Sequence, residues 1–339
     1  MRLSRRACSV VLLVASLWFI QHGLRRARSA TLQSGGTGQS TNLTGYPITI
    51  RNCGMAMTFL RPPARAIAMD QISTEILLHL GLKRSIVGTA FKTNEIFSTV
   101  AQDYKAVPVL AKMYPSKEVL TDASPDFILG NIDFFTYSGF PPGSNFTRRE
   151  LTDKGIKSYT LVCAGDDNNE ERIFERFREL GRIFGVGPRA DELIATVKQS
   201  LSRTADVLAS SHPITVFIYR SGAGPLLTFG GGGEADRGLN LSGGKNVFAD
   251  KTSLPPPSVS LETVIDRDPA AILISDEDTT PVEEKKRLIR RLLSGTQAVR
   301  ENHFCVADFY SYGTPFRLAR DVNVIGKCLH PDLAFPAFP

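Results

Sequence analysis

The stretch PRADELIATVKQSLSRTADVLA, residues 188–209, decides how the chain is organised. After its opening proline, which the first turn of a helix tolerates, it contains neither glycine nor proline. A helix of this length is about 33 Å long at 1.5 Å per residue. A shorter helical pattern precedes it between Glu170 and Phe184 and ends at Gly185. A stiff helix between two lobes predicts a small closing motion over a ligand in place of a wide hinge motion.

On both sides of this helix, apolar runs alternate with helical patterns, as expected when helices cover parallel sheets. About 290 residues follow Tyr46, which is more than one hydrophobic core usually holds. We therefore predict an α/β protein of two Rossmann-like lobes with mainly parallel central sheets, joined by a single long interdomain helix. The expected parts are an N-terminal lobe (46–167), a helical segment (168–211) and a C-terminal lobe (212–339). Within them we predict strands at 65–70, 85–88, 126–129, 157–162, 214–219, 270–274 and 303–307, and a helix at 73–80.

A short unit occurs once in each predicted lobe. SKEVL (116–120) leads to SPDFIL (124–129), and SLETV (260–264) leads to DPAAIL (268–273), with the same offset of 144 residues. In each copy serine can cap a short helix and proline precedes a buried strand. The matched spacing favours duplicated lobes, although such units also recur by chance in α/β proteins.

The N-terminus predicts export. Residues 1–6 carry three arginines, and 7–20 form an apolar run of about 14 residues, which fits a signal peptide and is short for a membrane span. We expect a signal peptide over 1–29, cleaved near Ser29, and a flexible linker over 30–45. An uncleaved membrane anchor is the alternative. The pair Arg5-Arg6 leaves both the general and the twin-arginine export routes open.

The charge distribution argues against nucleic-acid binding. The chain has 40 basic and 34 acidic residues, and six arginines without a balancing acid precede Ala30. The remaining 34 basic residues therefore match 34 acidic ones, and no long segment concentrates base.

Four cysteines remain after the leader that carries Cys8 is removed, and an exported chain favours disulfides. Four cysteines allow three pairings. Cys53–Cys163 and Cys305–Cys328 are the pairs that stay within a lobe if the halves fold separately. Four free buried thiols are the alternative.

Ligands of open α/β sheets bind beyond the carboxyl ends of the strands, so the loops that follow the strands supply the candidate site. Aromatic and basic residues alternate there, and we expect ligand contacts from Phe91, Lys92, Tyr114, Arg220, Tyr310, Tyr312 and Arg317. The histidines show no metal-ligand spacing, GGGG at 230–233 lacks the Gly-Lys-Ser/Thr of a phosphate loop, and no nucleophile motif is present. We predict no catalytic residue, no metal site and no cofactor.

In order and spacing, a set of segments resembles the helix-linked periplasmic solute-binding proteins for ferric siderophores, haem and cobalamin. No single segment is specific. The resemblance covers about Tyr46 to Leu333 and rests on YPITI (46–50), NCG (52–54), RAIAMD (65–70), TEILLHLGL (74–82), SPDFI (124–128), LGRIFG (180–185), GGKNVFAD (243–250), DP (268–269) and LHPD (329–332).

The resemblance implies a monomeric, non-catalytic receptor in the periplasm or on the outer face of the cytoplasmic membrane. Such a receptor captures a ferric siderophore or related metal chelate and delivers it to an ABC importer. A haem or cobalamin receptor, or an exported enzyme acting on a chelate, is the alternative.

In that family one acidic residue on each lobe is thought to dock on arginines of the permease. Glu75 matches the first of these, and we expect an exposed carboxylate early in a helix. On the second lobe Arg237 stands where the acid is expected, so Glu234 and Asp236 are the candidates.

Overall fold

A computed structural model describes residues 45–92, 95–131, 146–163, 169–252, 255–276, 280–307, 314–336 and 338. The predicted signal peptide, all of the predicted linker except Gly45, and the candidate residues Tyr310 and Tyr312 lie outside these ranges. Among the described helices, none is both long enough and apolar enough to cross a membrane.

The first sheet is parallel throughout, with the strand order β5-β4-β3-β6-β7. Its strands are β3 (Ala66–Ala68), β4 (Ile86–Ala90), β5 (Val109–Ala111), β6 (Phe127–Gly130) and β7 (Lys157–Thr160). The helices that connect them are α1 (Gln71–His79), α2 (Ala101–Tyr104), α3 (Lys117–Asp122) and α5 (Arg148–Asp153).

The second sheet is mainly parallel, with the order β11-β9-β8-β12-β13 and β10 paired to β8. Its strands are β8 (Ile214–Ser221), β9 (Leu226–Thr228), β10 (Gly244–Asn246), β11 (Ser258–Val259), β12 (Ala271–Ser275) and β13 (Phe304–Ala307). β9 runs antiparallel to β8, and β11 runs antiparallel to β9. The accompanying helices are α8 (Glu234–Leu241), α9 (Leu261–Asp266), α10 (Val282–Leu292), α11 (Gln297–Arg300) and α12 (Pro315–Leu329).

Both faces of each sheet are buried, which explains the continuous apolar runs of the central strands. In β12, Leu273 faces a core shared with α8 and α12, whereas Ile272 and Ile274 face a core on the opposite side of the sheet. Ile67 of β3 likewise faces away from its neighbours Ala66 and Ala68. This alternation follows from the two-residue period of a strand.

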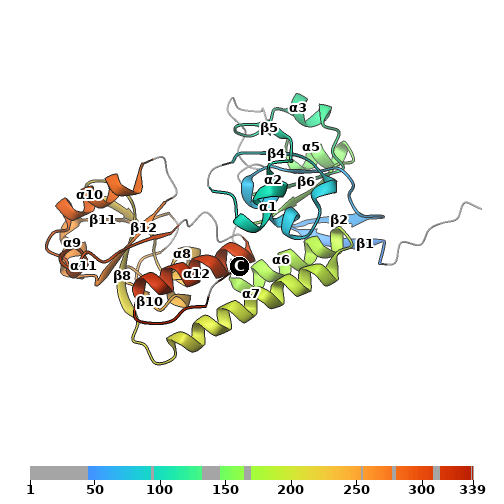
Figure 1. Cartoon of the computed structure of the whole chain (residues 1–339). Coiled ribbons are helices and arrows are strands. Elements are labelled where there is room, and N and C mark those ends of the chain that lie inside the picture. Colours follow the sequence, from blue (N-terminus) through green and yellow to red (C-terminus); the bar gives the residue numbers. More distant parts are fainter. Residues whose placement is uncertain are drawn as a thin grey trace, which may run out of the picture. The chain divides into compact units, whose positions relative to one another are not determined.

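In the sequence, two long helices connect the first sheet to the second: α6 (Glu170–Ile183) and α7 (Gly187–Leu208). They pack side by side (Figure 1). α7 has 22 residues, which confirms the predicted long helix with a shift of one residue at each end. Its first half supplies Leu193, Ile194 and Val197 to the core of the first lobe. Farther along, Thr204 Oγ1 lies 3.0 Å from Asn323 Oδ1 of α12. The predicted fold class, two α/β lobes with a long connecting helix, is confirmed.

The repeated unit is also repeated in the structure. Helix α3 and strand β6 begin 144 residues before α9 and β12. The residue before each proline, Ser124 or Asp268, has a positive φ of 47° or 36°. Ser116 and Ser260 each accept a hydrogen bond from the backbone N–H three residues later. The two copies therefore share their caps and turns as well as their sequence pattern.

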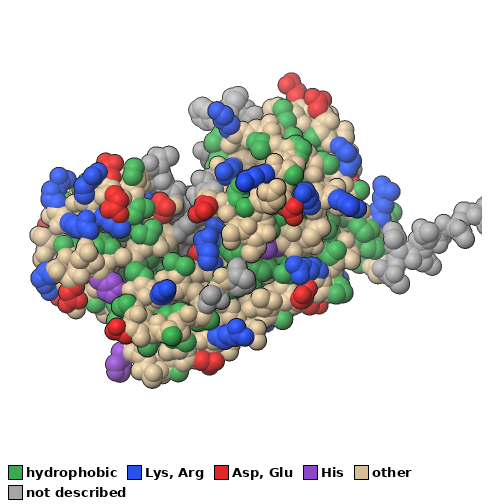
Figure 2. Space-filling model, in the orientation of Figure 1, with side chains coloured by type: hydrophobic (Ala, Val, Ile, Leu, Met, Phe, Trp, Pro, Cys, Tyr) green, Lys and Arg blue, Asp and Glu red, His purple; other side chains and the backbone are tan. Residues whose placement is uncertain are grey.

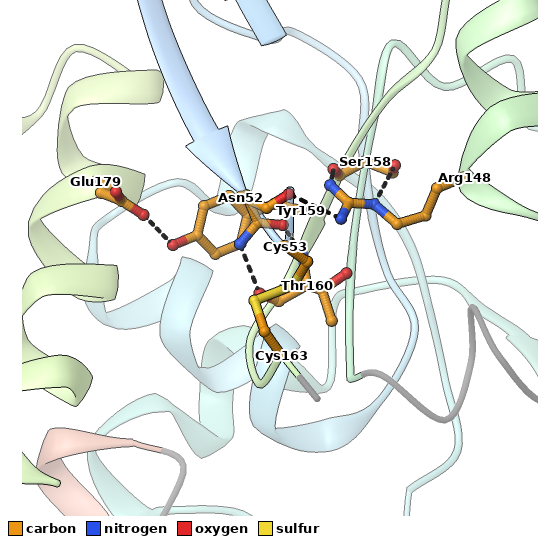
Figure 3. Close-up of a disulfide and its surroundings, with 8 residues drawn as sticks. All are labelled: Asn52, Cys53, Arg148, Ser158, Tyr159, Thr160, Cys163 and Glu179. Carbon is orange, nitrogen blue, oxygen red and sulfur yellow. Dashed lines mark hydrogen bonds between the residues drawn. A yellow bond between two sulfur atoms is a disulfide. The ribbon is translucent and has the colours of Figure 1, made fainter. Parts of the chain in front are cut away.

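A hairpin of β1 (Ile48–Asn52) and β2 (Met55–Phe59) is fastened to β7 of the first sheet (Figure 3). The Asn52 side chain donates to the carbonyl of Thr160 and accepts from its N–H, at 2.9 and 2.8 Å, as a neighbouring strand would. The disulfide Cys53–Cys163 lies beside these bonds. The second disulfide, Cys305–Cys328, joins β13 to α12, so both expected pairs are present.

Basic and acidic side chains are interspersed over the face shown in Figure 2. This distribution agrees with the balanced charge of the chain after residue 29.

Candidate ligand-binding site

The carboxyl ends of the first sheet's strands bring several polar and aromatic residues to one edge. Asp70 follows β3, caps α1 through the Ser73 N–H at 2.7 Å, and accepts from the Asn131 N–H beyond β6 at 3.2 Å. Burial raises the pKa of the Asp70 carboxyl. Asp70 thus ties the ends of two neighbouring strands together at this edge.

Phe91 and Tyr114 stack on each other at the same edge. Phe91 follows β4 and Tyr114 lies beyond β5; their ring centroids are 5.1 Å apart with 23° between the planes. Phe91 has a φ of 41°, a left-handed conformation that is uncommon for a bulky residue and is often found at functional sites. Lys92 follows Phe91 in the sequence, and Lys112 is two residues before Tyr114. Both lysines are exposed. The structure therefore brings two of the predicted ligand residues into contact and places the predicted Lys92 next to them.

On the second lobe, Arg220 lies near the carboxyl end of β8 and is half-buried. Its guanidinium lies 5.4 Å from the centre of the Phe229 ring, just beyond β9. The sequence had not indicated Phe229, because β9 is a three-residue strand without a recognisable pattern. Each lobe thus presents aromatic and basic side chains at the end of its strands.

Arg317, which was predicted as a ligand contact, is the third residue of α12 and forms a buried ion pair with Glu75. Its Nε and Nη2 donate to the two carboxylate oxygens at 2.7 Å each, and Nη2 also donates to the carbonyl of Glu95 at 2.7 Å. The Phe97 N–H and the Gln71 side-chain amide each donate a further hydrogen bond of 3.0 Å to Glu75 Oε1. Glu75 is 1% exposed and Arg317 2%.

The expectation of an exposed Glu75 is therefore wrong. Glu75 is also not early in its helix, because α1 begins at Gln71 and no acidic residue lies in its first turn. Arg317, near the start of α12, pairs with the Glu75 carboxylate. Phe316 in α12 stacks on His79 of α1 with 4.0 Å between ring centroids and 8° between the planes. Burial lowers the pKa of His79, whose Nε2 lies 3.0 Å from Thr99 Oγ1. The ion pair and the stacked rings together fix α12 to the first lobe.

The two candidate docking acids of the second lobe are also withdrawn from the surface. Asp236 is 6% exposed and accepts from the Gly232 N–H at 3.0 Å. Glu234 opens α8 and is half-buried; burial raises the pKa of its carboxyl to about 7, against the smaller opposing effects of Arg237 and Arg176. Neither residue is the exposed carboxylate that the resemblance implied.

Comparison with known proteins agrees with this architecture. A family model described as a periplasmic binding protein matches residues 67–310, well over half of the chain. A periplasmic binding protein from Veillonella parvula is 26% identical, with a TM-score of 0.73 over 84% of this chain and 98% of that one. A protein of an ABC-type Fe3+-hydroxamate transport system from Saccharomonospora viridis is 24% identical, with a TM-score of 0.65 over 84% and 98%.

Among curated sequences, a vitamin B12-binding protein from Photorhabdus laumondii is 22% identical over 238 residues, which cover 70% of this chain and 80% of that protein. The family-model match spans both sheets and the helices between them. The chain belongs to the periplasmic binding protein family, whose members are binding proteins of ABC transport systems and not enzymes.

Proposed function

We propose that this protein is exported, captures a ferric siderophore or related metal chelate as a monomer, and passes it unaltered to an ABC importer. The observation that supports this most directly is the pairing of aromatic and basic side chains at the strand ends of both lobes. In the first lobe these are Phe91 and Tyr114 with Lys92 and Lys112; in the second they are Phe229 and Arg220. The family model and the similar protein from Veillonella parvula are both described as periplasmic binding proteins, which supports export.

This composition suits an anionic chelate with flat faces. Ferric siderophores present anionic or catechol-rich surfaces, to which guanidinium and ammonium groups donate charge-assisted hydrogen bonds. Aromatic rings add stacking area at the same edge. A cobalamin receptor is the second candidate, supported by the vitamin B12-binding relative. Binding of that bulky ligand would depend less on the basic side chains.

Calorimetric titration of the purified chain with a ferric catecholate, a ferric hydroxamate, haemin and cyanocobalamin tests the proposal. Tryptophan fluorescence is unsuitable, because the single tryptophan, Trp18, lies in the predicted signal peptide. We expect the tightest binding for a ferric siderophore and full recovery of unmodified ligand. Preference for cyanocobalamin would support the second candidate, and many equivalents of altered ligand would identify an enzyme.

Arg220→Ala should weaken binding of the preferred anionic ligand by about 1 to 3 kcal/mol, because it removes a charged hydrogen-bond donor from the site. Arg300→Ala is the matched control, since Arg300 is exposed on α11, before the amino end of β13. Equal dissociation constants for the two variants would remove Arg220 from the site.

We also propose that the permease recognises Glu118 and Glu262 in place of the buried Glu75. Both are exposed in the first turn of a short helix, and they occupy equivalent positions in the repeated unit of the two lobes. Hydrogen bonds at the helix start lower the pKa of Glu262 and keep it charged. A carboxylate on each lobe could pair with arginines on a partner.

Charge reversal tests this assignment. Glu118→Lys and Glu262→Lys should reduce ligand uptake by cells that express the importer and leave ligand affinity unchanged. Asp122→Lys and Asp266→Lys are matched controls, because they reverse exposed acids at the opposite ends of the same two helices. Uptake lost equally in all four variants would reflect general charge repulsion and would contradict specific docking through the two glutamates.

A further inference from the structure

We propose that His303, Cys305 and Cys328 form a zinc-binding site when the disulfide between the two cysteines is reduced. One ligand atom from each of these residues lies within 4.8 Å of the other two. Among the described residues, this is the one group of three histidine, cysteine or acidic side chains placed closely enough to bind a metal ion. We call it the His–Cys–Cys cluster.

Strand geometry explains why the three side chains meet. His303 directly precedes β13 and Cys305 is its second residue, so the two-residue period directs both side chains to one face of the sheet. Cys305 lies in the core between that face and α12, and Cys328 comes from the last turn of α12. Strand and helix therefore supply the cluster from two rigid elements.

The histidine already has the partner that metal-binding histidines usually have. His303 Nε2 lies 3.0 Å from the backbone carbonyl of Cys328. Because a carbonyl can only accept, Nε2 donates its hydrogen, and the neutral ring keeps its lone pair on Nδ1. A hydrogen bond from one ring nitrogen to a carbonyl fixes the tautomer of a ligating histidine and orients the ring.

The His–Cys–Cys cluster lies apart from the proposed ligand site. His303 is at the amino end of β13, whereas Arg220, Phe91 and Tyr114 follow or lie near the carboxyl ends of their strands. Zinc binding is therefore an inference about a second site. Its failure would leave the proposed transport function untouched.

The chemistry requires a reductant, because the disulfide sulfurs are poor ligands. A dithiol exchanges with the Cys305–Cys328 bond, is itself oxidised to a cyclic disulfide, and leaves two cysteine thiols. Binding of Zn2+ then releases the two thiol protons to solvent and forms two zinc–thiolate bonds. Two thiolates and one imidazole match a tetrahedral zinc site whose fourth position holds water.

The test compares zinc binding before and after reduction. The chain is treated with a dithiol, desalted under argon, and titrated with zinc against a chromophoric chelator. We expect the reduced chain to bind about one equivalent more than Cys305→Ser/Cys328→Ser does under the same conditions. Mutation of a group that only hydrogen-bonds to a metal ligand typically weakens metal binding by roughly 10- to 100-fold. His303→Ala removes a ligand itself, so it should weaken zinc binding by at least this factor.

The other disulfide provides an internal control. Cys53→Ser/Cys163→Ser removes the other described cysteine pair and should keep the extra equivalent. Cobalt in place of zinc should give thiolate charge-transfer absorption in the unmodified reduced chain and not in Cys305→Ser/Cys328→Ser.

Folding is checked by circular dichroism, and zinc should raise the melting temperature of the reduced chain. The proposal is overturned if the reduced chain binds no more zinc than Cys305→Ser/Cys328→Ser, or if His303→Ala binds zinc as tightly as the unmodified chain.

Discussion

Glu75 and Arg317 form an ion pair that is removed from water on all sides. Burial of two charges is costly, and such a pair is tolerated when its geometry is good and its remaining hydrogen bonds are made. Here both carboxylate oxygens accept from the guanidinium, and Phe97 and Gln71 supply further donors. The carboxylate therefore links α1 to α12 and is not exposed on the surface.

Removing one member of the pair should destabilise the protein strongly. We expect Glu75→Ala to lower the free energy of unfolding by about 3 to 5 kcal/mol, because the Arg317 charge stays buried without its partner. Urea denaturation followed by circular dichroism measures the change. Glu75→Leu/Arg317→Met should lose less than Glu75→Ala, since no charge remains buried. A change within about 0.5 kcal/mol, as expected for the exposed Glu118→Ala, would contradict this reading of the pair.

Glu234 should make stability depend on pH. Its folded-state pKa of about 7 lies above the ordinary glutamate value, so the folded state holds the proton more tightly than the unfolded state. The resulting stabilisation is complete below about pH 4.5 and is lost as the pH rises through 7. Glu234→Gln, which mimics the protonated form, should therefore raise the melting temperature relative to the unmodified chain at pH 8.5 and change it little at pH 4.5. An equal shift at both pH values would show that the carboxyl is not held neutral.

The sequence predicted features that depend on local order, and it did not predict contacts between residues that are far apart in the chain. Phe91 follows β4, a predicted strand, so the rule about strand ends applies to it directly. Tyr114 follows β5, a short strand that was not predicted, and the structure shows that the two rings stack. Glu75 and Arg317 are 242 residues apart, and nothing in the sequence near either one signals the contact. The burial of Glu75 was therefore not predictable from its helix alone.

Among the elements, the long connecting helix and the central strands were predicted, whereas α10 and α12 were not. The helix expected at 188–209 is α7 (Gly187–Leu208), and the strand expected at 214–219 is β8 (Ile214–Ser221). Very short strands such as β5, β9 and β10 were missed, because three residues contain no measurable period. Their pairing is imposed by the neighbouring strands of the sheet.

The crossing of α6 and α7 depends on a glycine. A methyl group on Gly181 would lie 2.6 Å from the Cβ of Ala190, which is closer than two side chains can approach. Gly181→Ala should therefore lower stability despite the roughly 1 kcal/mol gained in helix propensity, because overpacking costs about 1 to 3 kcal/mol. Adding Ala190→Gly should recover part of the loss, and thermal melting measures both steps. Gly187→Ala is the control, since its added methyl meets no atom within 4 Å; equal behaviour of the two alanine variants would contradict the role of the close contact.

For the whole molecule, composition and alternation of elements were sufficient to predict two α/β lobes. They were not sufficient to predict how α12 is shared. Leu318, Val322 and Ile325 of α12 pack in the core of the second lobe, whereas Phe316 and Ala319 belong to the core of the first. This sharing is set by side chains that meet only in the folded chain.

Because α12 contributes to both cores, we predict that neither half folds autonomously. A fragment ending before Pro315 would leave the Glu75 carboxylate without its guanidinium and a void where Phe316 stacks on His79. We expect fragments 46–211 and 212–339, produced separately, to show low cooperativity in thermal melting, and coexpression to restore a single sharp transition through reassembly. Independent sharp melting of fragment 46–211 would refute this. A cut just after α7 is therefore expected to give two interdependent pieces, because side chains of α12 complete the interior of both.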